Sequence, residues 1–131
     1  METLQIRTHN REEMLDITGQ LRNLIQANGW SDGMLLLYCP HTTGAVTVNE
    51  GADPDVIRDI IVNLRKIVPP QGDYRHSEGN SDAHIKSSLF GCSQTLIIEG
   101  GQVQLGTWQK VYFCEFDGPR ARTLWVKFLK A

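Results

Sequence analysis

Four polar segments of the chain carry side chains that can act as acids, bases, metal ligands or anion-binding groups. The first, residues 40–53, holds His41, Asn49, Glu50 and Asp53. Imidazole and carboxylate groups exchange protons readily, so these four residues are candidates for acid–base catalysis. The alternative is a turn in which the histidine only satisfies local backbone groups.

The densest polar stretch is residues 74–84, which holds His76, Glu78, Asn80 and His84. Histidine is the commonest metal ligand and a general acid or base, so His84 joins the catalytic candidates. Asn80 or Ser81 would cap a following helix, whose N-terminus can hold a phosphate. The alternative is a solvated surface loop, and no HxH, HxxxH or HExxH spacing identifies a metal site. Two histidines close to two carboxylates nevertheless favour a functional role.

The last two segments supply groups for an anionic substrate. Residues 117–122 form a turn with Arg120 and Arg122, which can bind phosphate or carboxylate through paired N–H groups. Residues 105–109 end in Gln109, at the start of an expected strand. For these two segments the alternatives are a hairpin with solvated arginines and an edge strand with exposed ends.

Hydrophobic periodicity indicates the elements that must position these segments. Helices and strands mix without a regular βαβ rhythm, which predicts an α+β domain with mixed or antiparallel sheets and about three helices. We expect strands over residues 3–8, 34–39, 44–50, 96–98, 108–116 and 122–129, and helices over residues 11–28, from Pro54 to the Pro69-Pro70 pair, and over about 81–90.

Three of these expectations carry more detail. Asn10 and Glu13 match a capping box at the start of the first helix. The continuous apolar run 34–39 predicts a strand buried on both faces. The turn at 117–119 predicts that strand 122–129 returns to pair with strand 108–116.

Length and composition limit the class of protein. The 131 residues suit one domain, 1–131, and thirteen basic against fifteen acidic residues argue against a nucleic-acid or anionic-membrane partner. No apolar run is long enough to span a bilayer, and the first residues do not resemble a signal peptide. An odd cysteine count without a CxxC pair favours the cytoplasm, with Cys39 and Cys114 as buried side chains. No P-loop, GxGxxG or GxSxG motif is present, so we expect no nucleotide cofactor.

The polar segments, in this order, resemble the YjbQ-like family, which is credited with a secondary thiamine-phosphate synthase activity. The resemblance covers essentially the whole chain. Its most specific parts are the Gly-Thr-Trp-Gln segment at 106–109 and the Asp-Gly-Pro-Arg segment at 117–120. The other matching segments are His41-Thr42-Thr43, Asn49-Glu50, Asp53 to Val56, His76, Glu78-Gly79-Asn80, Ala83-His84, Ser93 to Gly101, Glu115 to Arg120 and Arg122.

The resemblance implies an α+β homotrimer and a transferase that joins a pyrimidine methyl diphosphate to a thiazole phosphate and releases pyrophosphate. Its phosphorylated substrate would need cations around the leaving oxygens: a divalent metal, Zn²⁺ or Mg²⁺, or Arg120, Arg122 and Lys86. His41, His76 and His84 are then the expected metal ligands. The alternative function is a non-catalytic homotrimer that binds a metal or a phosphorylated metabolite.

Overall fold

The computed structural model describes residues 1–131 and contains two antiparallel sheets and three helices. The five-stranded sheet has the order β1-β8-β3-β5-β6, and the three-stranded sheet has the order β2-β7-β4. The predicted α+β class and helix number are therefore confirmed. The elements are β1 (Glu2–Arg7), β2 (Glu13–Asp16), α1 (Thr18–Asn28), β3 (Gly33–Tyr38), β4 (Gly44–Glu50), α2 (Pro54–Ile67), α3 (Ser81–Phe90), β5 (Ser93–Glu99), β6 (Gln102–Gln104), β7 (Gln109–Glu115) and β8 (Ala121–Lys130).

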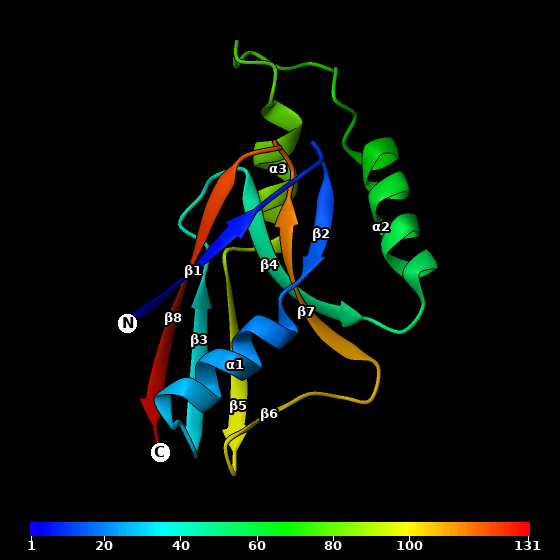
Figure 1. Ribbon diagram of the computed structural model, residues 1–131. Helices are drawn as coiled ribbons and strands as arrows, with labels where there is room; N and C mark the ends of the chain where they lie inside the picture. Colours follow the sequence, from blue (N-terminus) through cyan, green and yellow to red (C-terminus); the bar gives the residue numbers. More distant parts are fainter.

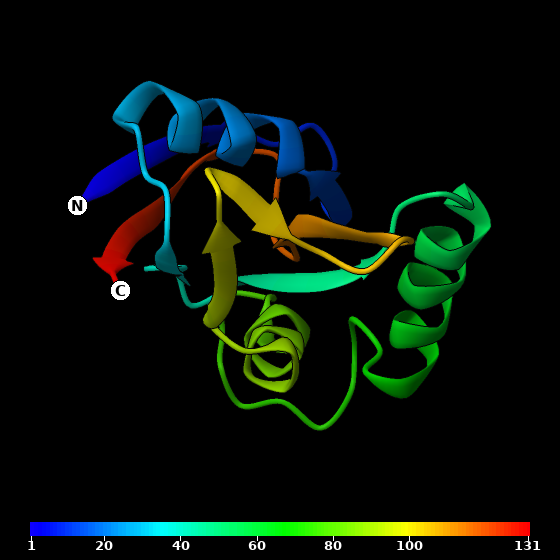
Figure 2. The same cartoon turned by 90° about the horizontal axis from the view of Figure 1, so that it is seen from below.

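Two apolar cores hold these layers together. The larger core joins both sheets to α1 and includes Leu21, Leu35, Phe113 and Leu124, each fully buried. The smaller core lies on the other face of β4 and β7, where α2 and α3 pack. Figures 1 and 2 show α1 and α3 on opposite sides of the strands, with α2 standing beside them. None of the three helices is both long and apolar enough to cross a bilayer.

The first helix is shorter than the sequence predicts. Residues 13–16 form β2, which pairs with β7, and the helix begins only at Thr18. The Glu13 carboxylate accepts the backbone N–H groups of His9 and Asn10, so one of the two contacts of the expected capping box occurs, in the turn between β1 and β2. Local capping chemistry is satisfied in either setting, and burial of Met14 in the smaller core selects the strand.

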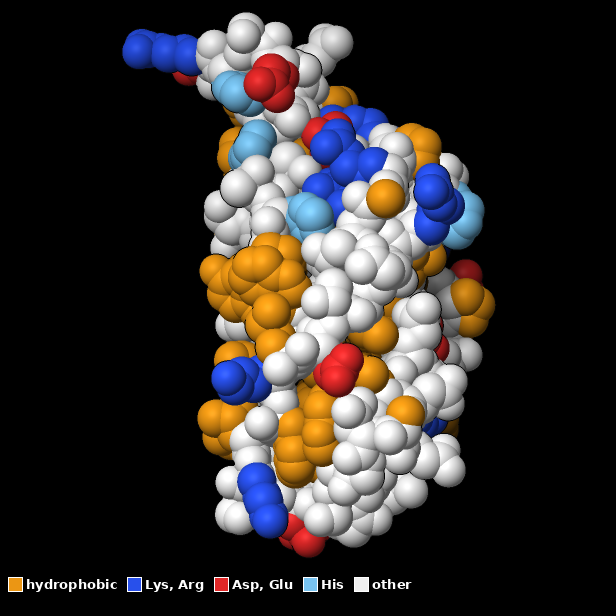
Figure 3. Space-filling view, turned by 60° about the vertical axis from the view of Figure 1, so that its left-hand side comes forward, with side chains coloured by type: hydrophobic (Ala, Val, Ile, Leu, Met, Phe, Trp, Pro, Cys, Tyr) orange, Lys and Arg blue, Asp and Glu red, His pale blue; other side chains and the backbone are white.

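The strand β3 is buried on one face and open on the other, so the expectation of two buried faces is wrong. Leu35 and Leu37 are fully buried, but Met34 and Tyr38 are 47% and 42% exposed. The strand register aligns Met34 with Leu129 and Ile97, and Tyr38 with Trp125. We call the large side chains on this side the open sheet face: Met34, Leu36, Tyr38, Ile97, Trp125, Lys127 and Leu129 (Figure 3).

The turn after β7 does not form the expected hairpin. Strand β8 pairs with β1 and β3, whereas β7 pairs with β2 and β4. The chain therefore crosses from one sheet to the other at residues 116–120. Gly118 allows this crossing, because a Cβ there would lie 2.4 Å from the Asn10 carbonyl oxygen and 2.8 Å from Cγ of Glu115.

The helix α2 begins as the sequence predicts but packs loosely. The Asp53 side chain accepts the N–H of Asp55 at 2.9 Å, and Pro54 occupies the first helical position. No residue of α2 is fully buried, and Ile67 at its end is 72% exposed. Its apolar stripe is therefore only partly covered by the smaller core.

Candidate functional site

A polar pocket of about 360 Å³ lies where the start of α3 meets the ends of both sheets. The loop before β4, the loop before α3 and the crossing between β7 and β8 each contribute to it. Its lining contains no apolar side chain: Thr42, Thr43, Glu78, Gly79, Asn80, His84, Asp117 and Arg120. We call this the α3 pocket. It combines three of the four segments that the sequence singled out.

Arg120 is the cation of the α3 pocket. Its Nε donates to the Asp117 carbonyl oxygen at 2.9 Å, and its Nη2 donates to Asp117 Oδ2 at 3.0 Å. The side chain is 49% exposed, so the rest of the guanidinium faces solvent. A partly held, partly free arginine is well placed to bind an anion through two N–H groups.

Asn80 also lines the pocket and is tied to the same carboxylate. Its Nδ2 donates to Asp117 Oδ2 at 2.8 Å, while its Oδ1 is buried and has no hydrogen-bond donor. Asn80 precedes α3 as predicted but makes no side-chain capping bond. A buried acceptor without a partner is rare in native proteins and marks an incomplete hydrogen-bond arrangement.

Arg122 is not available to a substrate, which corrects the sequence prediction. It is 3% exposed and makes two hydrogen bonds to the buried carboxylate of Glu115, one from Nε at 2.9 Å and one from Nη2. Nη2 also donates to Thr43 Oγ1 at 2.8 Å. The arginine therefore serves as a structural support behind the pocket, because a desolvated guanidinium must keep its partners.

The same carboxylate organises the crossing between the sheets. Thr8 Oγ1 donates to Glu115 Oε1 at 2.8 Å, and the Asp117 N–H donates to Oε2 at 3.1 Å. Burial raises the pKa of Glu115, but the hydrogen bonds from Arg122, Thr8 and the Asp117 N–H outweigh it and hold that pKa below its ordinary value. Glu115 is thus ionised and positions Asp117 and Arg120.

Lys86 is also committed to the interior, so its assignment to phosphate binding is wrong. Its fully buried Nζ donates to Glu12 Oε2 at 2.8 Å and to Asp82 Oδ2 at 3.2 Å. Arg11 makes a two-pronged contact with Asp82 at 3.0 and 3.1 Å, and Arg65 of α2 donates to Glu12 at 3.0 Å. This second ion network ties α3 and α2 to the turn between β1 and β2.

The three expected metal ligands do not form one cluster. The rings of His76 and His84 lie edge to face with centroids 5.3 Å apart. His41 instead accepts the Thr123 N–H on Nε2 at 3.0 Å, which places the ring proton on Nδ1. Burial and the charge of Arg122 lower the pKa of His41, which favours that neutral form. No group of three or more His, Cys, Asp or Glu side chains in the chain is arranged to hold a metal ion.

The remaining catalytic candidates lie at the other end of β4, away from the α3 pocket. Asn49 and Glu50 are the last two residues of β4, and Glu50 pairs with Gln109 of β7. With seven residues in β4, this end is about 20 Å from its start. Each side chain there has a local role: Asp53 caps α2, Glu50 accepts the Asp53 N–H, and Gln109 accepts the Gly106 N–H.

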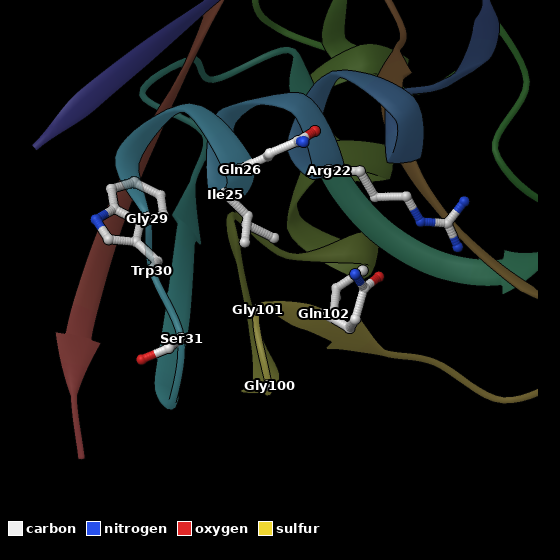
Figure 4. Close-up of a pocket in the computed structure, with 10 residues that line it drawn as sticks. Arg22, Ile25, Gln26, Gly29, Trp30, Ser31, Gly100, Gly101 and Gln102 are labelled. Carbon is white, nitrogen blue, oxygen red and sulfur yellow. The ribbon is translucent and has the colours of Figure 1, made fainter.

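A larger groove of about 510 Å³ lies elsewhere, between α1 and the turn that joins β5 to β6 (Figure 4). Arg22 and Gln26 of α1 and Gln102 of β6 border it. None of the candidate site residues lines this groove, so size alone does not identify the site.

Sequence reasoning placed Thr43, Glu115 and Asp117 in segments that match the family but gave them no role at the site. Asp117 belongs to the Asp-Gly-Pro-Arg segment, and its position directly before an arginine-bearing turn was the available signal. No local signal distinguishes Glu115, because its role depends on a partner in β8 and another after β1.

Comparison with known proteins places the chain in a family. The model of the "UPF0047 protein YjbQ-like" family matches residues 2–131. The chain belongs to the UPF0047 family. UPF0047 protein YugU of Bacillus subtilis is 49% identical over 130 residues, 98% of each chain, and UPF0047 protein MJ1081 of Methanocaldococcus jannaschii is 52% identical over 125 residues, 95% of this chain and 91% of the relative.

Two solved structures agree with the fold. An uncharacterised YjbQ/UPF0047 protein from Clostridium acetobutylicum superposes with a TM-score of 0.95 at 53% identity, covering 98% of this chain and 100% of that one. A hypothetical protein from Aeropyrum pernix gives a TM-score of 0.93 at 38% identity over the full length of both chains.

The same comparisons overturn the expected activity. The UPF0047 relatives carry names that describe an uncharacterised family, and none is named a thiamine-phosphate synthase. The prediction of thiamine-phosphate synthesis, which rested on the resemblance and not on the residues, is therefore withdrawn.

Proposed function

We propose that the α3 pocket binds a small phosphorylated molecule and that this binding is the basis of the protein's function. The observation that carries the proposal is Arg120, half-exposed in a pocket with no apolar lining and held in place by Asp117. The threonine hydroxyls at 42 and 43 and the N-terminal turn of α3 add neutral donors. The candidates Asn80, His84 and Arg120 all line this pocket.

Arg120→Lys is expected to weaken binding of inorganic phosphate by about tenfold or more, because an ammonium group cannot make the two-pronged contact. Isothermal titration calorimetry measures the change. Arg22→Lys is the matched control, since Arg22 borders the groove at α1 and should leave phosphate affinity unchanged. Equal phosphate affinity in wild type and Arg120→Lys would refute the proposal. Both variants should unfold near the wild-type temperature, because exposed ion pairs contribute little.

We also propose that the chain assembles into a homotrimer through the open sheet face. Two observations support self-association: six of the seven residues of this face are apolar, and several are more than 40% exposed. Tyr38 and Trp125 stack there with centroids 5.8 Å apart. Isolated chains seldom leave so many adjacent large apolar side chains in water. The expectation of three copies comes from the family resemblance.

Light scattering at micromolar concentration is expected to give three times the chain mass of 14.8 kDa. Leu36→Asp should shift the mass to that of one chain, because a carboxylate at the centre of the face would be buried unpaired in the assembly. Gln20→Asp, on the exposed side of α1, is the control and should leave the mass of the assembly unchanged. A wild-type mass of 14.8 kDa would eliminate the assembly.

A further inference from the structure

The α3 pocket contains hydrogen-bond acceptors that an anion does not satisfy, because an anion itself accepts hydrogen bonds. Asp117 receives hydrogen bonds only on Oδ2, from Asn80 and Arg120, so its Oδ1 has no protein donor. Oδ1 of Asn80 also lacks a donor, but it is buried and does not face the ligand. Glu78 adds a carboxylate that is 71% exposed, with only His76 near it at 3.7 Å.

These acceptors determine what else the ligand must carry. The dianionic phosphate group of an ester brings only negative charge and acceptor oxygens, which the carboxylates of Asp117 and Glu78 repel. Hydroxyl groups are donors whose hydrogen bonds carboxylate oxygens readily accept, and they would supply the partners that Asp117 Oδ1 and the Glu78 carboxylate lack. A ligand with hydroxyls beside its phosphate therefore complements both halves of the pocket.

The lining also argues against an apolar body. Typical ligand pockets are mostly hydrophobic, whereas none of the residues lining this one is. Asn80 holds Asp117 in place through the 2.8 Å bond from its Nδ2 to Asp117 Oδ2, which fixes the free Oδ1 of that carboxylate. This fixed carboxylate and the exposed carboxylate of Glu78 in the same pocket suit hydroxyls on neighbouring carbons.

We propose that the ligand of the α3 pocket is a phosphorylated polyol or sugar, with its phosphate on Arg120 and neighbouring hydroxyls on Asp117 and Glu78. This inference rests on the proposed function, because it assumes that the pocket binds phosphate esters. It adds that the hydroxyls, and not the phosphate alone, determine affinity.

The test compares two phosphate esters with the same number of carbon atoms. Glycerol 3-phosphate carries two adjacent hydroxyls and propyl phosphate carries none. Calorimetry on the wild-type protein is expected to show at least tenfold tighter binding of glycerol 3-phosphate, since two hydrogen bonds to carboxylate acceptors are gained. Asn80→Ala, which releases Asp117 from its fixed position, should lose most of this preference. Asn63→Ala, on the exposed side of α2, is the matched control and should retain the preference.

The possible results separate the two proposals. Equal affinity for both esters, with binding still dependent on Arg120, would overturn the inference and leave the proposed function standing. No binding of either ester or of inorganic phosphate would overturn both. A preference that persists fully in folded Asn80→Ala would overturn the assignment of the hydroxyls to these side chains. The comparison of the two esters on the wild-type protein does not depend on the folding of any variant.

Discussion

Replacing Glu115 with alanine is expected to lower the free energy of unfolding by about 3–5 kcal/mol. Arg122 is 3% exposed and would lose its only carboxylate partner, keeping just its contacts with Thr43. The cost arises because a buried guanidinium left without its counter-charge has already lost its hydration. Urea denaturation followed by circular dichroism measures the change.

Two further variants separate the ion pair from general effects of mutation. Glu99→Ala removes an exposed glutamate of β5 that makes no ion pair, so it should change stability by less than about 0.5 kcal/mol. The double variant Glu115→Leu with Arg122→Met removes both charges and should be more stable than Glu115→Ala alone. A double variant less stable than the single one would contradict this account of the pair.

Replacing Asp82 with alanine should have a comparable effect, about 3–5 kcal/mol, through the second ion network. Asp82 is fully buried and accepts from Arg11 and from the fully buried Lys86. Its removal leaves Glu12 as the sole carboxylate facing three cations. Asp59→Ala provides the contrast, because Asp59 and Arg58 are 61% and 68% exposed and their pair should contribute at most about 1 kcal/mol.

The same network predicts how the stability of the wild-type protein depends on pH. Burial raises the pKa of Asp82, but its bonds from Arg11 and Lys86 outweigh burial, and the resulting pKa is below the ordinary value. Its stabilising effect is therefore complete above the unfolded-state pKa, about 4, and is lost as pH falls through the lower folded-state value. Denaturation at stepwise lower pH should show that the free energy of unfolding falls less steeply in Asp82→Ala than in wild type. Identical pH profiles would mean that Asp82 is not ionised in the folded protein.

Much of the fold follows from local signals, and the errors occur where distant contacts override them. The pattern around Asp53 and Pro54 located the start of α2, and Gly29 located the end of α1, where its φ is +64°. Residues 11–17 have helical spacing, but pairing with β7 makes part of them a strand. The apolar run of β3 indicated a strand but could not reveal that one of its faces stays open within a single chain.

The candidate site shows the same limit more clearly. Residue type alone could not distinguish Arg120, which faces solvent, from Arg122, which is buried two positions later. Lys86 likewise has the composition of a phosphate ligand but lies among carboxylates that come from two other segments. The sequence identified residues whose side chains can do chemistry. Which of them line the pocket and which are buried supports depends on the sheet that each strand joins.

The most direct test of phosphate binding at the α3 pocket is a nuclear magnetic resonance titration of the ¹⁵N-labelled protein with inorganic phosphate. The backbone amide signals of Gly79, Asn80, Ser81 and Arg120 are expected to shift together along one saturable curve. The signals of Arg22, Gly101 and Gln102, at the larger groove, should stay in place. Saturable shifts confined to that groove, or no saturable shifts in either region, would contradict the account.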